Sequence, residues 1–447
     1  MHSKRTINIP LFLLGMFSAT EIRLVGSAAI SEWFIFVVAP FMFIKNLRLL
    51  RQDGFMPLLW LAIAVSVSNF ISCFVNDVAW DFALRGMATN YSIFAIPVVM
   101  HNYLRKDLSG FKWFLVGGAI SALISIFIFQ KGSEIGLANK MGIEASEAIL
   151  ENEFLWTARI GGWLALPINA FYYSTPLLYS MLEPFLFSLY FVVTSSSGRS
   201  AALVGMSSAV LIFIGGKRRK NMARIKKYFY LMATIALLGL SVVKIAYVHA
   251  AKSGILGEEA QRKYAMQTRG NDSALSIIMG GRSDFFMGLV AALERPFWGY
   301  GPWPIDKDGF AERFLYEHAD YEEIQAHERM KIIAAQNGVI TQGWIPTHSH
   351  LIGFWVWYGL AGLIFWLYVL RVVFQVIKNG MDAIPQWYGY LCCFIPGFVW
   401  AIFFSPYGRR VGTMTGVVCL LLVRAVANGR IRLPYEMERE AYSQDNK

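Results

Sequence analysis

Long apolar stretches recur along the chain, and short polar segments rich in Lys and Arg separate them. A helix needs about 20 apolar residues to cross a hydrocarbon core of about 30 Å, and it satisfies its own backbone hydrogen bonds. This pattern predicts an all-α, polytopic membrane protein with about twelve transmembrane helices. The predicted spans are 7–22, 28–45, 56–75, 87–103, 111–130, 161–181, 184–197, 200–216, 228–248, 349–371, 387–404 and 411–428.

Basic residues follow spans 2, 4, 8, 10 and 12, at 45–51, 105–106, 217–227, 371–378 and 430–432. Because Lys and Arg accumulate on the cytoplasmic side of membrane proteins, these segments and both termini are predicted to be cytoplasmic. The resulting organisation has four parts. Residues 1–248 hold spans 1 to 9, 249–347 form a large periplasmic loop with short helices, 348–430 hold spans 10 to 12, and 431–447 form a cytoplasmic tail.

Composition supports this class. The chain is 56% hydrophobic with only 16% charged residues, below the roughly 25% of soluble proteins. A net charge of +11 would suggest nucleic acid for a soluble protein, but here the positive-inside bias and anionic membrane lipids account for it, so no nucleic-acid partner is expected. The four cysteines all fall inside apolar spans and are interpreted as small apolar side chains.

Arg282 is the first candidate for chemistry at the outer face. It follows Gly281 at the predicted start of a helix on or in the membrane interface, which Pro296, Gly299 and Gly301 would end. A guanidinium beside the positive end of a helix makes a good anion site. The alternative is a surface arginine that pairs with a neighbouring carboxylate or a lipid phosphate.

His348 and His350 directly precede the apolar span that begins near residue 351. A histidine at the membrane boundary titrates near neutral pH and can accept a proton from a hydroxyl group. The alternative is an interfacial histidine in an aromatic belt with Trp355 and Trp357. A zinc site would need a third ligand, and none follows nearby in the sequence.

Three further arginines lie at the outer ends of predicted spans, Arg199 at span 7 and Arg409 and Arg410 at span 11. Each is a candidate anion ligand, and the alternative is a side chain that snorkels to the membrane surface. Nucleotide-sugar transferases usually hold a metal through an Asp-x-Asp pair. The only such pair, at 306–308, lies in the predicted outer loop, where nucleotide sugars are absent. No Walker motif or Gly-x-Ser-x-Gly elbow occurs, so neither metal nor cofactor is expected.

Three of these segments together resemble the O-antigen ligase and O-antigen polymerase superfamily of bacterial inner-membrane proteins. Ser197-Gly198-Arg199-Ser200 is similar to its Ser-Arg-Gly-like segment. Gly281-Arg282 through Pro296-Phe297-Trp298-Gly299-Tyr300-Gly301 is similar to its Gly-Arg helix ending in Pro-x-x-Gly-x-Gly. His348-Ser349 through Gly359-Leu360-Ala361-Gly362 is similar to its His-Asn segment leading to Gly-Leu-x-Gly, with Ser349 in place of the Asn. The resemblance covers roughly residues 155–380.

This resemblance implies a GT-C-type glycosyltransferase that is metal-independent and inverting, with an undecaprenyl-diphosphate-linked glycan as donor at the periplasmic face of the inner membrane. Arg282 would be catalytic and would bind the diphosphate with Arg199, Arg409 and Arg410. His348, eleven residues before Gly359 as in the family, would be the catalytic base, and His350 is the second choice.

Three functions stay open at this point. A polysaccharide polymerase would use another lipid-linked repeat unit as acceptor, and a chain-length regulator is then a candidate partner. An O-antigen ligase would use lipid A-core as acceptor. A polysaccharide or lipid transporter would need charged residues at mid-membrane depth, whereas the charges in this chain gather at the ends of the spans.

Overall fold

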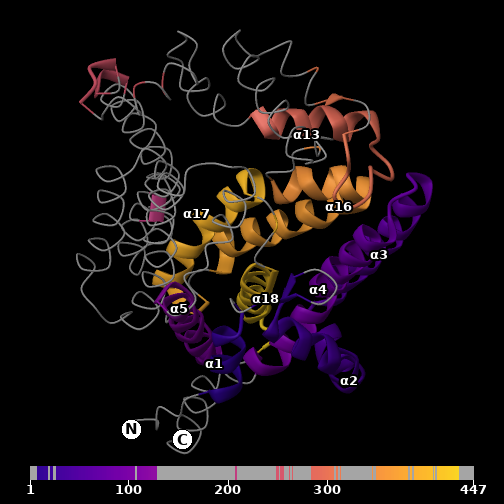
Figure 1. The fold of residues 1–447 in the computed structure, drawn as a ribbon. Helices are drawn as coiled ribbons and strands as arrows, with labels where there is room; N and C mark the ends of the chain where they lie inside the picture. Colours follow the sequence, from indigo (N-terminus) through magenta and orange to yellow (C-terminus); the bar gives the residue numbers. More distant parts are fainter. Residues whose placement is uncertain are drawn as a thin grey trace, which may run out of the picture.

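The structure is a computed structural model, which describes residues 8–18, 21–23, 27–105, 108–127, 207–208, 248–250, 252–255, 261, 264, 283–306, 309–310, 313, 345, 349–380, 383–384, 387–405, 407 and 410–431. These residues are mostly α-helical (Figure 1). In chain order the longer elements are α1 (Ile9–Met16), the strands β1 (Glu21–Arg23) and β2 (Ser27–Ala29), α2 (Ile30–Gln52), α3 (Met56–Val75), α4 (Trp80–Leu104), α5 (Phe111–Phe127), α13 (Ser283–Glu294), α16 (His350–Gln375), α17 (Tyr388–Phe404) and α18 (Arg410–Ala427). A 3₁₀ turn, Leu108–Gly110, precedes α5, and a π-helical turn, Val376–Gly380, continues α16.

Four of the described helices are long and apolar enough to cross a membrane: Ile30–Gln52, Met56–Val75, His350–Gly380 and Arg410–Ala427. They coincide with predicted spans 2, 3, 10 and 12. The prediction of a helical protein with membrane-spanning helices is therefore confirmed for these segments, and the total of twelve stays a prediction.

α18 lies at the centre of the described helices (Figure 1). Its residues 419–423 have no exposed surface, and the helix packs against α4 and α16. α4 in turn contacts α2 and α3, whose outward faces carry exposed apolar side chains such as Phe41, 73% exposed, and Phe74, 86% exposed. Apolar side chains that point outward from spanning helices are the surface that lipid tails would cover.

The first predicted span, 7–22, is wrong as a spanning helix. α1 has only eight residues, about 12 Å at 1.5 Å per residue, and an antiparallel β1–β2 hairpin follows it. α1 instead crosses α5 closely, because a Cβ on Gly15 would lie 2.0 Å from the Phe114 carbonyl oxygen and one on Gly117 would lie 2.1 Å from the Phe12 oxygen. Small residues allow such backbone approach between apolar helices.

One end of the bundle is joined at the α2–α3 turn, which we call the inner end. Asp53 at this turn is fully buried, and its Oδ2 accepts hydrogen bonds from His101 Nε2 at 2.8 Å and Arg105 Nε at 2.6 Å. Arg424 of α18 donates to the Gly54 carbonyl oxygen at 3.0 Å and to Gln375 at 3.3 Å. Four helices are thus tied to one turn.

Burial by itself raises the pKa of the Asp53 carboxyl, but the hydrogen bonds from His101 and Arg105, together with the positive charge of Arg105, outweigh burial and lower that pKa. The carboxylate is therefore the stable form. The helix ends that meet here are those that the charge pattern placed on one side of the membrane. Their assignment to the cytoplasm stays a prediction.

Candidate functional site

Of the six predicted site residues, four lie outside the described residues: Arg199, Arg282, His348 and Arg409. His350 and Arg410 are described. Both lie at the opposite end of the bundle from Asp53, which we call the outer end. The candidate site is therefore built from these two residues and from the described segments that adjoin the other four.

α16 is broken near its start. Gly359 has φ 59° and ψ −148°, far from helical values, in a region of backbone conformation that essentially only glycine adopts. In a regular α-helix the Leu360 N–H would donate to the Val356 carbonyl oxygen. It donates instead to the carbonyl oxygen of Phe297, at 3.1 Å.

The segment 296–301 fills the break by pairing with the freed backbone of α16. Tyr300 N–H donates to the Val356 oxygen at 2.7 Å, and Gly301 N–H donates to the Trp357 oxygen at 3.0 Å. A Cβ on Gly299 would lie 2.5 Å from the same Val356 oxygen, and one on Gly359 would lie 2.0 Å from the Phe297 oxygen. Glycine is required at both positions because the two backbones touch.

Two of the three sequence motifs are therefore parts of one structure. The Pro-x-x-Gly-x-Gly segment and the Gly-Leu-x-Gly segment, read as separate motifs in the sequence, are hydrogen-bonded to each other through Gly299 and Gly359 and their neighbours. The predicted helix before the first motif is confirmed as α13, Ser283–Glu294, which ends just before Pro296 and packs on α16.

Three polar residues near the outer end of α3 complete the junction. Ser68 Oγ donates to the Tyr358 oxygen at 2.7 Å and Ser72 Oγ to the Trp357 oxygen at 3.3 Å. Asn76 Nδ2 donates to the Gly299 oxygen at 3.1 Å, and its Oδ1 accepts from Arg295. Broken helices inside membranes need such substitute partners. The sequence analysis missed these residues, and their spacing of four along one helix face was the available signal.

His350 is the first residue of α16, and Ser349 caps the helix by accepting from Ile352 N at 3.1 Å. Asn and Ser are both favoured N-cap residues, so Ser349 can cap the helix as the Asn of the family motif would. The His350 side chain is 3% exposed. Because a carbonyl only accepts, its Nδ1–H donates to the Ser405 oxygen, at 2.7 Å. His350 thus joins the start of α16 to the end of α17.

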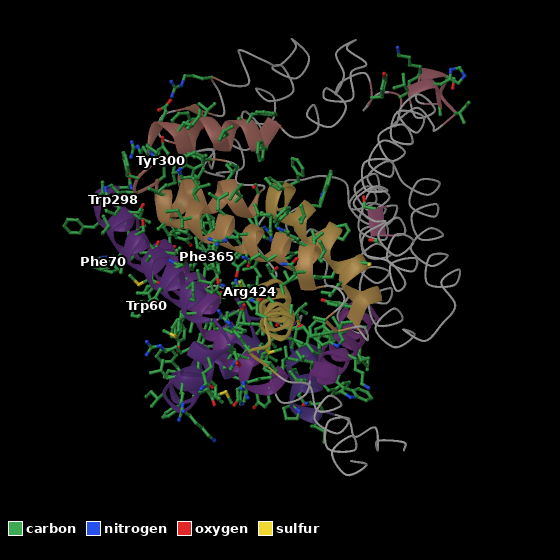
Figure 2. All side chains as sticks on the ribbon, turned by 180° about the vertical axis from the view of Figure 1, so that it is seen from behind. Trp60, Phe70, Trp298, Tyr300, Phe365 and Arg424 are labelled. Carbon is green, nitrogen blue, oxygen red and sulfur yellow. The ribbon has the colours of Figure 1, made fainter. Side chains whose placement is uncertain are left out.

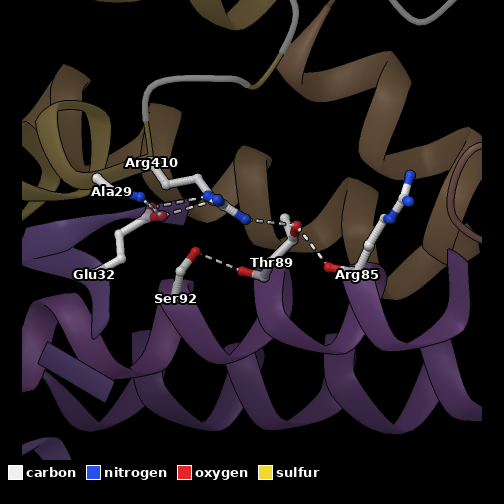
Figure 3. A network of polar contacts seen from close by, with 6 residues as sticks. All are labelled: Ala29, Glu32, Arg85, Thr89, Ser92 and Arg410. Carbon is white, nitrogen blue, oxygen red and sulfur yellow. Dashed lines mark hydrogen bonds and ion pairs between the residues drawn. The ribbon is translucent and has the colours of Figure 1, made fainter. Parts of the chain in front are cut away.

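Arg410 is paired rather than open to solvent (Figure 3). Its side chain is 14% exposed and contacts the Glu32 carboxylate through both Nε and Nη2, each at 2.8 Å. Its Nη1 also donates to Thr89 Oγ1 at 3.3 Å, while Glu32 Oε2 accepts from the Ala29 N–H at 3.0 Å. A cation at the N-terminus of α18 opposes the helix dipole, and Glu32 offsets this.

Of the four site residues outside the described part, three have described neighbours near the end of α17. Phe285, three residues after Arg282, has its ring 5.8 Å from that of Phe404. His350, two residues after His348, binds the next residue, Ser405. Arg409 follows four residues later in the chain. The described neighbours of Arg282, His348 and Arg409 therefore gather around residues 404–405.

Among the described residues, no group of three or more His, Cys, Asp or Glu side chains could hold a metal ion. Cys73, Cys392 and Cys419 are free and buried, which agrees with their interpretation as small apolar side chains. Metal-independent chemistry stays a prediction, since four of the six predicted site residues lie outside this part of the chain.

Comparison with known proteins assigns neither a family nor a function to this chain. No protein-family model matches the chain, and no curated protein matches its sequence. The similarity to the O-antigen ligase and polymerase superfamily therefore stands on the three motifs and on the order in which they occur.

Proposed function

We propose that this protein is a bacterial inner-membrane polysaccharide polymerase of the GT-C type. It transfers a glycan from undecaprenyl diphosphate onto another lipid-linked repeat unit at the periplasmic face, without metal and with inversion at the anomeric carbon. The observation that carries the proposal is the meeting of described residues near Arg282, His348 and Arg409 around Phe404 and Ser405.

In this proposal the arginines act on the leaving group. The diphosphate already carries negative charge, and guanidinium groups can stabilise it as the glycosidic bond breaks. Arg282 grips the diphosphate, with Arg199 and Arg409 as further ligands. Arg410, which Glu32 and Thr89 hold at the start of α18, fixes the position of the preceding Arg409.

His348 is the proposed base. It accepts the proton of the acceptor hydroxyl as that oxygen attacks the anomeric carbon, a contribution typically worth about 10²–10⁴-fold. His350 is a positioning residue in this proposal, because its Nδ1–H is directed at the Ser405 oxygen and its ring is enclosed.

The test is polymer formation by the purified protein in nanodiscs, with an undecaprenyl-diphosphate-linked oligosaccharide as both donor and acceptor. Wild-type protein should yield a ladder of products on a gel. Arg282→Lys keeps the charge but loses the bidentate fork and should lower the rate strongly, and His348→Ala should abolish the ladder. His350→Gln, whose amide can still donate to Ser405, should retain more activity than His350→Ala.

Two outcomes would overturn the proposal. Transfer only when lipid A-core is supplied as acceptor would make the protein a ligase. Movement of the lipid-linked glycan across the bilayer without any new glycosidic bond would make it a transporter. A normal ladder from His348→Ala would end the role of that histidine as base.

A further inference from the structure

Phe297 and Trp298 form an exposed apolar tip on an otherwise buried segment. Phe297 is 68% exposed and Trp298 is 48% exposed, whereas Tyr300, two residues later, is 7% exposed. Large apolar side chains on a protein surface mark a contact with a partner or a membrane when they adjoin further apolar surface. The question is therefore what this tip adjoins.

The tip continues the outward face of α3. Trp60, Phe70 and Trp298 follow one another along the same edge of the molecule (Figure 2), and Trp60 and Phe70 are 62% and 59% exposed. α3 is one of the helices apolar enough to span a membrane. The two surfaces are also held together close to the tip by a hydrogen bond, since Asn76 Nδ2, directly after α3, donates to the Gly299 oxygen.

The tip is held in place by its backbone. The Phe297 oxygen accepts from Leu360 N–H, and the Pro296 oxygen accepts from Trp355 Nε1 at 3.1 Å. These bonds fix the turn against the break in α16, so Phe297 and Trp298 point outward because the backbone directs them there. They cannot fold back into the core without breaking the junction.

We propose that the turn 296–298 inserts Phe297 and Trp298 into the outer leaflet of the bilayer, at the boundary between acyl chains and head groups. An indole ring, apolar with one N–H donor, suits this boundary. The ligand class is membrane phospholipid, and the anchored turn is the same one that closes the break in α16. Because this turn also closes the break in α16, its depth in the bilayer is coupled to the backbone of the candidate site.

This assignment differs from the aromatic belt considered for Trp355 and Trp357 in the sequence. Both of these residues make internal contacts. Trp355 Nε1 donates to the Pro296 oxygen, and the ring of Trp357 lies 4.7 Å from that of Trp303. We therefore assign the interfacial aromatic residues at this end of the molecule to the turn 296–298 and not to α16.

The test places an environment-sensitive fluorophore on Trp298→Cys, in a variant of the full chain whose four native cysteines are replaced by serine, reconstituted in phospholipid nanodiscs. Lipids with a nitroxide near the head group should quench this probe more than aqueous iodide does. Glu294→Cys is the matched control, because Glu294 is exposed at the end of α13, just before the turn. Its probe should be quenched mainly by iodide.

Phe297→Cys provides a second probe position, should the label at 298 prevent folding, as judged by size-exclusion chromatography. Quenching of the tip by iodide and not by lipid would overturn the proposal, since the turn would then face water. Protection from both quenchers would overturn it as well, because protein and not lipid would then cover the tip. The experiment does not require transferase activity, so it is independent of the proposed function.

Discussion

At the outer end of the bundle, α16 is broken, and backbone N–H groups and serine hydroxyls bond to the carbonyl oxygens that the break frees. At the inner end, unbroken helices are joined through the buried carboxylate of Asp53. The outer junction depends on Gly299 and Gly359, which let two backbones touch. The inner junction depends on Asp53, whose carboxylate accepts hydrogen bonds from His101 and Arg105. Both junctions connect helices at positions where the hydrogen bonding within a helix stops.

The difference teaches where function can be placed. An ion pair buried among helix ends fixes the relative position of the helices, as Asp53 does at the inner end. A broken helix exposes backbone polar groups at membrane depth, which is tolerated where they are satisfied or line a cavity. The described parts of two of the three motifs lie at the outer end, at the break. Four substitutions test this contrast, from the largest expected effect to the smallest.

Gly359→Ala should have the largest effect. The backbone conformation alone costs about 3 kcal/mol for a residue with a side chain, and the new Cβ would lie 2.0 Å from the Phe297 oxygen. We expect little monodisperse protein in detergent and no polymer. Gly429→Ala is the control at the inner end, since Gly429 also has positive φ, 68°, but has nothing within 4 Å. Equal losses in both variants would show that contact at the break is unimportant.

Asp53→Asn should destabilise the inner end by about 3–5 kcal/mol, because it leaves the charge of Arg105 without its buried partner. Asp77→Asn, at an exposed carboxyl near the outer end, should have little effect. Melting temperatures from tryptophan fluorescence in detergent would measure both. A melting temperature for Asp53→Asn equal to that of the wild type would contradict the role of Asp53 as the inner hub.

The stability of the wild type should also depend on pH through Asp53. Its folded-state pKa lies below the unfolded value, so its contribution is present above about pH 4, the usual unfolded pKa of Asp, and is lost as the pH falls through the folded pKa. Melting temperatures between pH 6 and pH 3 should fall more steeply for the wild type than for Asp53→Asn. Parallel curves would rule out this linkage.

Glu32→Gln should cost about 3 kcal/mol, at the low end for a broken buried ion pair, because Arg410 keeps some contact with solvent. Arg410→Gln should cost a similar amount. The double variant should be less destabilised than the sum of the two, since the two side chains interact directly. Strict additivity in these melting experiments would show that the pair contributes no coupling energy.

Ser68→Ala should have the smallest effect, about 1–2 kcal/mol, by removing a hydrogen bond to the buried Tyr358 oxygen. Ser66→Ala on the same helix is the control, because Ser66 Oγ donates only within α3, to the Ala62 oxygen at 2.9 Å. If the break in α16 relies on α3, Ser68→Ala should also lower transferase activity more than Ser66→Ala does. Identical behaviour of the two variants would remove α3 from the outer junction.

The sequence predicted the existence of the long described helices, but span 2 ends at 45 where α2 continues to Gln52, and span 4 begins at 87 where α4 begins at Trp80. The short helix α1 was predicted wrongly. Predicted span 3, at 56–75, coincides with α3, and spans 10 and 12 begin within one residue of α16 and α18. The length of an apolar run decides such helices, since the hydrocarbon core requires about 20 residues. The run at 7–22 was long enough to mislead. The close packing of Gly15 against α5 depends on residues distant in sequence, and a local hairpin, 21–23 with 27–29, follows α1.

The candidate site shows the same division. The resemblance to the family's motifs singled out Gly299, Gly301 and Gly359, and the sequence also predicted that Gly299 and Gly301 end a helix. Nothing in the spacing indicated that Gly299 would meet Gly359, or that Arg410 would pair with Glu32, which lies 378 residues away. Such pairs form only when helices pack.

By itself, then, the sequence determined that the protein is helical with membrane-spanning helices and where the long described helices lie, because hydrophobic length acts locally. The tertiary structure decided which carbonyl oxygens the break in α16 frees and which groups satisfy them. It also decided that Arg410 is neutralised by Glu32 and that Asp53 joins the α2–α3 turn to α4. Hydrogen bonds and ion pairs act over about 3 Å, so they depend on packing that no local pattern records.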